Sequence, residues 1–404
     1  MRKRWWLCHA TNFQSLMYPC FIVCRVLGLF SYKINTSTFE TSKPRYILSS
    51  IVISVFSVIN LVLIHDIVTS KRIFGDITWD IHAVIYYAFS NFTVIVTHVL
   101  SGPRMRLLQT IWEISSKLPP KSYQKMSRFI HVKDILSIIF RLVQLYLNFS
   151  EKILENTINF FFVLIGALTV YFALLVLQII MMYINCVCIL KACFKEINDN
   201  LMHMQWHMIR NDIEPSVPRI IYHTQSNKFL LLKLKNLKKR HMMISDTVQM
   251  LNVIFNLQLL GTIVTSFSVI TFEMYFYLVR WQDGIFISLD RNFLIKVLPA
   301  IMYNGSIIML LVWACETSKN QAREIRTTIH DLLNTTNNKK IKYELQLFSL
   351  QILHRENIFA VKGLNINATL LAAMVGCITT YLIILIQFLH MSHSCGRKTG
   401  INNN

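Results

Sequence analysis

Charge is scarce in this sequence, and negative charge is scarcest. Only 15% of its 404 residues are charged, and 21 Asp and Glu stand against 41 Lys and Arg. Soluble chains carry about 25% charged residues. Together with a hydrophobic share of 53% and a mean hydropathy of +0.44, the shortage excludes a soluble globular protein and indicates a membrane protein. The net charge of +20 then points to an anionic membrane leaflet rather than to nucleic acid.

The motifs of catalysis and cofactor binding are also missing. The chain contains no GxSxG, HExxH, CxxC or glycine-rich phosphate loop. His203 and His207 have the spacing of metal ligands on a helix, but no third ligand accompanies them, so a packed or solvated helix face is the better interpretation. His390, His393 and Cys395 form an equally thin cluster. We therefore expect no enzymatic activity, no metal site and no cofactor.

Helix-breaking residues are few, with 11 Gly and 8 Pro. A transporter is typically built from Gly- or Pro-broken helices at matching positions in two halves. Here only Pro299 interrupts a predicted span, and no internal repeat is present. A transporter therefore remains an alternative, as does another non-channel seven-helix receptor. G-protein-coupled receptors fit poorly because NPxxY, DRY and an external Cys pair are all absent.

Long uncharged runs predict seven membrane helices, since a bilayer core needs about 20 mostly apolar residues. Six runs meet this length directly. The seventh, 129–149, carries Lys133, Asp134 and Arg141 and is included because the basic loops stop alternating without it. The expected helices fall within 47–65, 80–104, 129–149, 155–191, 246–273, 296–316 and 362–397.

Lysine and arginine then gather in the N-terminal segment and in the second, fourth and sixth loops. By the positive-inside rule the N-terminus is cytosolic and the C-terminus extracellular. The fold class we predict is an all-α polytopic membrane protein.

Amphipathic helical patterns continue several spans beyond the membrane. "KACFKEINDNLMHMQWHMI", "KFLLLKLKNLKKRHMM" and "KYELQLFSLQILHRENIFAV" each repeat apolar residues at helical spacing. None can bury its apolar face alone, so we predict a cytosolic anchor bundle. The expected organisation is a cytosolic N-terminal segment with an interfacial helix (1–46), membrane helices one to four (47–184), a cytosolic extension (185–249), helices five and six (250–315), a second cytosolic helix (316–362), the last membrane helix (363–391) and an extracellular tail (392–404).

The C-terminal residues resemble a known signature. The segment 348–388 contains "TTYLIILIQF", and Thr380, Tyr381, Gln387 and Phe388 match without a gap the Thr-Tyr, five apolar residues and Gln-Phe that end insect gustatory receptors. Upstream, Gln351, His354, Phe359, Gly363, Leu364, Leu371 and Gly376 also fit, and "CRVLGLFSY" resembles the family's N-terminal segment. Two positions depart from the pattern: Asn365 replaces an apolar aromatic residue, and Leu382 replaces the Glu of the trehalose-responsive branch.

The resemblance implies a gustatory receptor that works as a ligand-gated, non-selective cation channel. Four subunits, identical or mixed, would surround one pore lined by the last helix, in the plasma membrane of sensory dendrites. The implied partners are a sugar or bitter tastant, permeating cations and membrane lipids. On that helix Tyr381, Ile384 and Phe388 form one apolar stripe, and the resemblance assigns this stripe and Gln387 to the gate and pore wall. The alternative is a Gln387 amide that bonds to another helix of the same subunit.

The ligand site is expected among aromatic and polar residues in the outer halves of the spans, where stacking and hydrogen bonding suit a small organic molecule. Any one of them can instead be an interfacial or packed residue. Glu273 is the preferred contact because a carboxylate near the end of a span needs a partner. Gln144 and Tyr146 lie at the same level. The predicted set is Asp80, His82, Tyr86, Tyr87, Thr271, Glu273, Tyr275, Trp281 and Tyr303.

Overall fold

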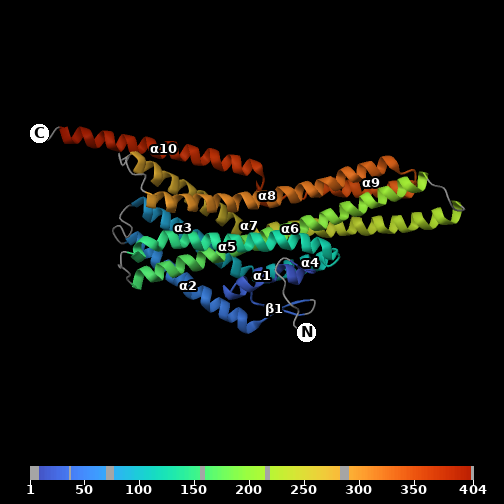
Figure 1. The fold of residues 1–404 in the computed structure, drawn as a ribbon, viewed down its shortest axis with the longest axis horizontal. Helices are drawn as coiled ribbons and strands as arrows, with labels where there is room; N and C mark the ends of the chain where they lie inside the picture. Colours follow the sequence, from blue (N-terminus) through green and yellow to red (C-terminus); the bar gives the residue numbers. More distant parts are fainter. Residues whose placement is uncertain are drawn as a thin grey trace.

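The fold is a bundle of long helices from which a narrower helical arm projects (Figure 1). This computed structural model describes the backbone of residues 9–35, 38–69, 77–154, 160–213, 219–282 and 291–401. Side chains are described within these ranges except at 77, 150–154, 160–162, 210–213, 219–227, 279–282, 291–296 and 388–401. The helices are α1 (Phe13–Val26), α2 (Lys43–Thr69), α3 (Ile77–Val99), α4 (Ser101–Ser115), α5 (Pro120–Leu154), α6 (Phe160–Ile213), α7 (Arg219–Gln282), α8 (Arg291–Thr335), α9 (Lys339–His354) and α10 (Ala368–Ile401).

The expected all-α membrane architecture is confirmed, but not every predicted span is apolar enough to be a membrane helix by its own composition. In the described part of the chain five helices are long and apolar enough to cross a bilayer: α2, α6, α7, α8 and α10. A sixth is obtained if α3 and α4, bent by 66° at their junction, count together. α5 is too polar to qualify by composition, yet it packs along α6 and α8. Its Lys133, Asp134 and Arg141 are buried in protein, so lipid does not have to solvate them.

The N-terminal helix α1 lies inside the fold rather than only on a membrane surface. Asn12 caps it, since the Ser15 amide donates to Asn12 Oδ1 over 2.8 Å. One face, which includes Phe13, Leu16 and Phe21, is buried, and the helix packs on α5 and α6. The chain then turns at Gly28, which has a φ of +79°, into the antiparallel hairpin β1 (Tyr32–Ile34) and β2 (Phe39–Thr41). The helix predicted within the N-terminal segment is therefore α1, and a hairpin follows it before α2.

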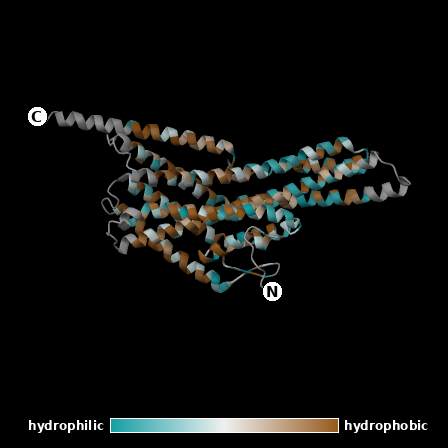
Figure 2. Ribbon diagram, viewed as in Figure 1, coloured by the Kyte–Doolittle hydropathy of each residue, from teal (hydrophilic) through white to brown (hydrophobic). Residues whose placement is uncertain are grey.

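The arm consists of the extensions of α6, α7 and α8, and α9 packs against α7 and α8 (Figure 1). Hydrophilic residues are more frequent in the arm than in the bundle (Figure 2). Lys238 Nζ donates to Glu344 Oε2 over 2.7 Å, and this bond, helped by Lys235, lowers the pKa of Glu344. Thr328 Oγ1 donates to Asn198 Oδ1 over 2.7 Å. Helices continue past the apolar runs as the sequence predicts, although the cytosolic location of the arm stays a prediction.

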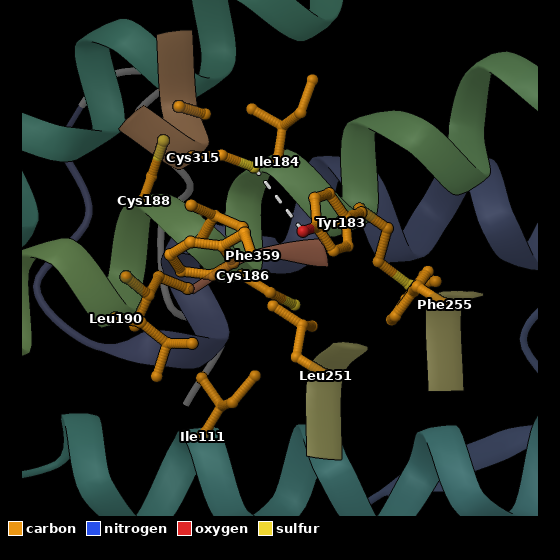
Figure 3. Packing of buried hydrophobic residues seen from close by; sticks show 14 of the residues in the cluster. Ile111, Tyr183, Ile184, Cys186, Cys188, Leu190, Leu251, Phe255, Cys315 and Phe359 are labelled. Atoms are coloured by element: carbon orange, nitrogen blue, oxygen red, sulfur yellow. Dashed lines mark hydrogen bonds between the residues drawn. The ribbon is translucent and has the colours of Figure 1, made fainter. Parts of the chain in front are cut away.

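The core is densest where α6, α7 and α8 meet (Figure 3). Tyr183 lies edge-on to Phe255 at a ring distance of 5.4 Å, and its hydroxyl is 3.6 Å from Cys315 Sγ. Phe359, which follows α9, also reaches this core and is buried. The segment after α9 is therefore held against α7.

A tight hairpin reverses the chain before the last helix. β3 (Ala360–Val361) pairs with β4 (Leu364–Asn365), and the two loop residues, Lys362 and Gly363, have φ of 43° and 86°. Positive φ at both positions is typical of a type I′ turn, which prefers glycine. α10 then runs alongside the bundle and continues to Ile401, into the expected tail.

Candidate functional site

The last helix, α10, lies at the edge of the subunit (Figure 1). Only 11% of its apolar window is buried, and its packing is against α7 and α8. Leu382 faces this contact, whereas Tyr381 and Ile384 are 54% and 40% exposed. Tyr381 touches Phe267 of α7 edge-on at 6.0 Å. Of the predicted pore stripe, Tyr381 and Ile384 are thus left largely uncovered by the subunit.

Gln387 is also exposed. An amide wedged between helices of one subunit would be covered on both sides, so the exposure argues against the intrasubunit alternative. Phe388, the last predicted gate residue, lies outside the residues whose side chains are described. Its backbone continues α10 one position beyond Gln387.

Two predicted ligand residues meet around a buried arginine of α5. Arg141 Nη2 donates to the Tyr86 hydroxyl over 3.1 Å, and Nη1 donates to Gln144 Oε1 over 2.6 Å. The guanidinium also lies 4.5 Å above the ring of Tyr303. Its Nε is buried and finds no hydrogen-bond partner in the described part of the chain. Residues from α3, α5 and α8 therefore form one polar aromatic cluster with an unused donor.

Sequence reasoning missed the role of Arg141 and treated it only as a cost to the third span. A charged residue inside a membrane segment signals a functional site by default, and that signal was available.

A second group of aromatic rings joins α3 to α7. Trp79 stacks on Phe276 at 3.9 Å with an interplanar angle of 4°, and His82 lies 5.2 Å from Phe272. His82 Nε2 is buried and has no hydrogen-bond partner within the described ranges. His82 and Tyr86 are about one turn apart on α3, so this group and the Arg141 cluster lie along the same helix. Trp79, Phe272 and Phe276 were not predicted.

Two other predicted residues are occupied by structural contacts. The Tyr87 hydroxyl is 2.7 Å from Thr169 Oγ1 of α6, and the Tyr87 carbonyl accepts from Asn60 of α2 over 3.0 Å. Thr271 Oγ1 donates to the Phe267 carbonyl of its own helix over 2.8 Å. Both side chains are buried, so packing explains them without a ligand.

The acidic and outermost residues are placed less centrally. Asp80, Glu273 and Tyr275 are partly buried near the ends of α3 and α7. Among the described residues Glu273 has neither a hydrogen bond nor a salt bridge. Trp281 lies in α7, outside the described side chains.

The arrangement suits a small molecule with an aromatic or hydroxylated surface. It offers ring faces for stacking, an arginine donor without a partner, a buried imidazole nitrogen and a carboxylate. These groups come from helices that the sequence separates widely and only packing brings together.

Comparisons with known proteins agree with this architecture. The family model described as "7tm Chemosensory receptor" matches residues 17–391. Gustatory receptor 28b of Drosophila melanogaster is 30% identical over 168 residues, 40% of this chain and 35% of that protein. Gustatory receptor 23a of the same species is 28% identical over 170 residues, 42% of this chain and 44% of that protein. These matches thus span less than half of either relative.

The solved insect olfactory receptor OR5 from Machilis hrabei, in complex with eugenol, has the same fold. It superposes with a TM-score of 0.71 at 12% identity, over 93% of this chain and 98% of that chain. This likeness covers both the bundle and the arm. With a family model that matches nearly the whole length, the chain belongs to the 7tm chemosensory receptor family, and the Drosophila relatives that it resembles are gustatory receptors.

Proposed function

We propose that the chain is one subunit of a ligand-gated, non-selective cation channel that a small organic tastant, a sugar or a bitter compound, opens at the plasma membrane. The exposed stripe of α10 carries this proposal. Gln387 lies on an apolar helix at a position that the subunit leaves open. An unpartnered amide in lipid costs on the order of several kcal/mol. It must therefore face water or another subunit.

A ring of four copies of α10 would meet that requirement. Tyr381, Ile384 and Phe388 step by three and four residues, so they share one face of the helix. Bulky apolar side chains around a narrow axis close a pore by excluding water, and amides beside them can solvate a passing cation. The arm, with its exposed apolar residues, would join the subunits on the cytosolic side.

The ligand would bind among α3, α5, α7 and α8, at the aromatic residues around Arg141 and His82. The olfactory receptor of the same fold was solved in complex with eugenol, which supports an organic ligand for this chain. The alternatives are a transporter and a non-channel receptor, and neither requires α10 to line an ion pore. The experiment below separates these functions because only a channel carries ligand-dependent current through α10.

Replacement of Phe388 by Ala tests the gate. The shorter side chain should widen the apolar constriction and raise the ligand-free current. Patch recording from cells that express the wild type, Phe388→Ala and Ile383→Ala measures this directly. Ile383 lies on the same helix about 100° away from the stripe, and it is the matched control because its truncation should leave the resting current unchanged.

An unchanged resting current in Phe388→Ala at normal surface expression would reject the gate. The absence of any cation current from the wild type, across sugars, bitter alkaloids and amino acids, would reject the homomeric channel.

A further inference from the structure

A basic cavity lies between α5, α6 and α8, well separated from the ligand residues along α5. It has a volume of about 580 Å³. Two lysines of α5, Lys121 and Lys125, and two of α6, Lys191 and Lys195, line it. In the part of the chain that the structure describes, the salt bridges leave all four without a carboxylate partner. Four ammonium groups without a salt bridge around one cavity favour an anionic ligand.

Two carboxylates temper this charge without cancelling it. Glu196 and Asp199, one turn and two turns beyond Lys191 on α6, also line the cavity. Glu196 Oε1 accepts a hydrogen bond from Asn200 Nδ2 over 3.0 Å, so it is directed along its own helix. The cavity keeps a positive excess, and these two groups should weaken the binding of an anion.

Aromatic rings form the other wall. Phe129 of α5 and Trp313 of α8 lie 5.1 Å apart, and Lys191 Nζ lies 5.1 Å from the centre of the Trp313 ring. Exposed Trp is typical of the level at which the hydrocarbon of a bilayer meets its headgroups. The positive-inside orientation proposed above places this level at the cytosolic leaflet.

An apolar track continues from the cavity toward the membrane centre. On α5 it consists of Val132, Leu136 and Ile139, which are exposed and share one face. On α8 the track consists of Met309 and Met302, which are exposed and follow Trp313 toward the N-terminal end of that helix. A soluble anion would use only the lysines, whereas a phospholipid would use the lysines and the track together.

We propose that this cavity binds the phosphorylated headgroup of an anionic phospholipid of the cytosolic leaflet, with the acyl chains along α5 and α8. The lysines surround the phosphates, Trp313 marks the depth of the glycerol, and the apolar track holds the chains. The choice of the cytosolic leaflet depends on the proposed orientation of the chain. Lipid binding itself does not depend on the proposed channel function.

Binding is testable with the full-length receptor in nanodiscs. Phosphatidylinositol bisphosphate is titrated into phosphatidylcholine nanodiscs, and bound lipid is counted by native mass spectrometry. Replacement of all four cavity lysines by Gln should weaken binding by at least about tenfold. The matched control removes the same charge from the exposed arm, at Lys239, Lys339, Lys340 and Lys342. It should bind like the wild type.

A second variant has the opposite expected sign. Glu196→Gln with Asp199→Asn removes the repulsion and should tighten binding, which misfolding would not do. This variant also tests lipid binding at the cavity if the lysine variant fails to fold. Free inositol trisphosphate distinguishes a lipid site from a soluble-anion site, and it should compete weakly because it lacks acyl chains.

Equal loss in the cavity and arm variants would overturn the proposal, as would no gain in the carboxylate variant. Competition by inositol trisphosphate at the affinity of the lipid would assign the cavity to a soluble anion instead. Because the assay needs no current, the outcome is independent of whether the receptor is a channel.

Discussion

Arg141 is the residue on which the candidate ligand site depends. It is only 7% exposed and holds three groups from different helices: Gln144 beside it on α5, the Tyr86 hydroxyl and the Tyr303 ring. An arginine inside a membrane protein keeps its charge, so its donors must be used by protein, water or ligand. One donor, Nε, has no partner among the residues whose side chains the structure describes.

Removal of the Tyr86 hydroxyl should therefore disturb the ligand response more than removal of the Tyr303 hydroxyl. Tyr86→Phe deletes the acceptor that orients Arg141, and hydrogen bonds to charged groups contribute about 1.5–3 kcal/mol. We expect the half-maximal ligand concentration to rise by roughly tenfold or more. Tyr303→Phe keeps the ring that Arg141 contacts and is the control. Equal dose-response curves for both variants would contradict the positioning role of Tyr86.

Glu273 is a partly buried carboxylate without a partner among the described residues. If it contacts the ligand, Glu273→Gln should impair the response while surface expression stays intact, since the two side chains have the same shape. Glu324→Gln, on the arm, removes a carboxylate far from the site and serves as the control. Dose-response recording with surface labelling measures both effects. A normal response would remove Glu273 from the site.

At the scale of the element, the β3–β4 hairpin explains part of the C-terminal signature. Gly363 adopts a φ of 86°, and Asn365, which departs from the family pattern, pairs with Ala360 across the turn. At the start of α10, Asn367 Oδ1 accepts a hydrogen bond from the Leu370 amide over 3.2 Å. The path from the arm to α10 is thus set by a turn and a cap rather than by an apolar aromatic side chain.

A side chain at Gly363 should loosen this connection. Gly363→Val forces a β-branched residue into the left-handed region, at a cost of about 1–2 kcal/mol or more. We expect a lower melting temperature of the purified receptor and a changed resting current, because the hairpin sets the start of α10. Lys362→Asn, at the neighbouring left-handed position, should be neutral or stabilising, since Asn tolerates this conformation. The opposite order of stabilities would show that the turn is not as described.

For the whole molecule, the exposed apolar surface of the arm calls for a partner. On α9 Tyr343, Leu350 and Leu353 are exposed, with Leu350 at 61%. Glu344 and Gln351 of the same helix bond back to α7, so the inner face of α9 is already occupied. A surface of this kind outside the bilayer marks a protein contact.

A charge at Leu350 should therefore reduce assembly. Leu350→Asp places a carboxylate in the expected contact, where central apolar residues contribute about 2 kcal/mol or more, and we expect dissociation into smaller species. Mass photometry of the detergent-solubilised receptor measures the distribution. Lys342→Asp, on an exposed polar position of α9, is the control. An unchanged mass distribution in Leu350→Asp would place the subunit contact elsewhere.

Several features were predictable from particular residues. The uncharged runs located α2, α6, α7, α8 and α10, and the amphipathic repeats predicted that helices continue into an arm. Periodicity failed where structure depends on distant contacts. The β1–β2 hairpin follows a run that reads as helix. The span within α5 was predicted only from the alternation of the basic loops, because its own hydropathy does not show that its charged residues face α3, α6 and α8. For the ligand site, Tyr86 and Tyr303 were predicted, but their meeting at Arg141 was not.

The sequence by itself determined the membrane environment, the helical class and the family, because hydropathy, helical period and the Thr-Tyr to Gln-Phe signature are local properties of the chain. Tertiary structure alone decided which polar residues in the membrane are packed and which are available. Tyr87 and Thr271 are held by neighbouring helices, whereas Gln387 stays exposed and Arg141 keeps one unused donor. Inside the bilayer, a polar side chain finds its hydrogen-bond partner on another helix. The sequence of one segment does not determine where that neighbouring helix lies.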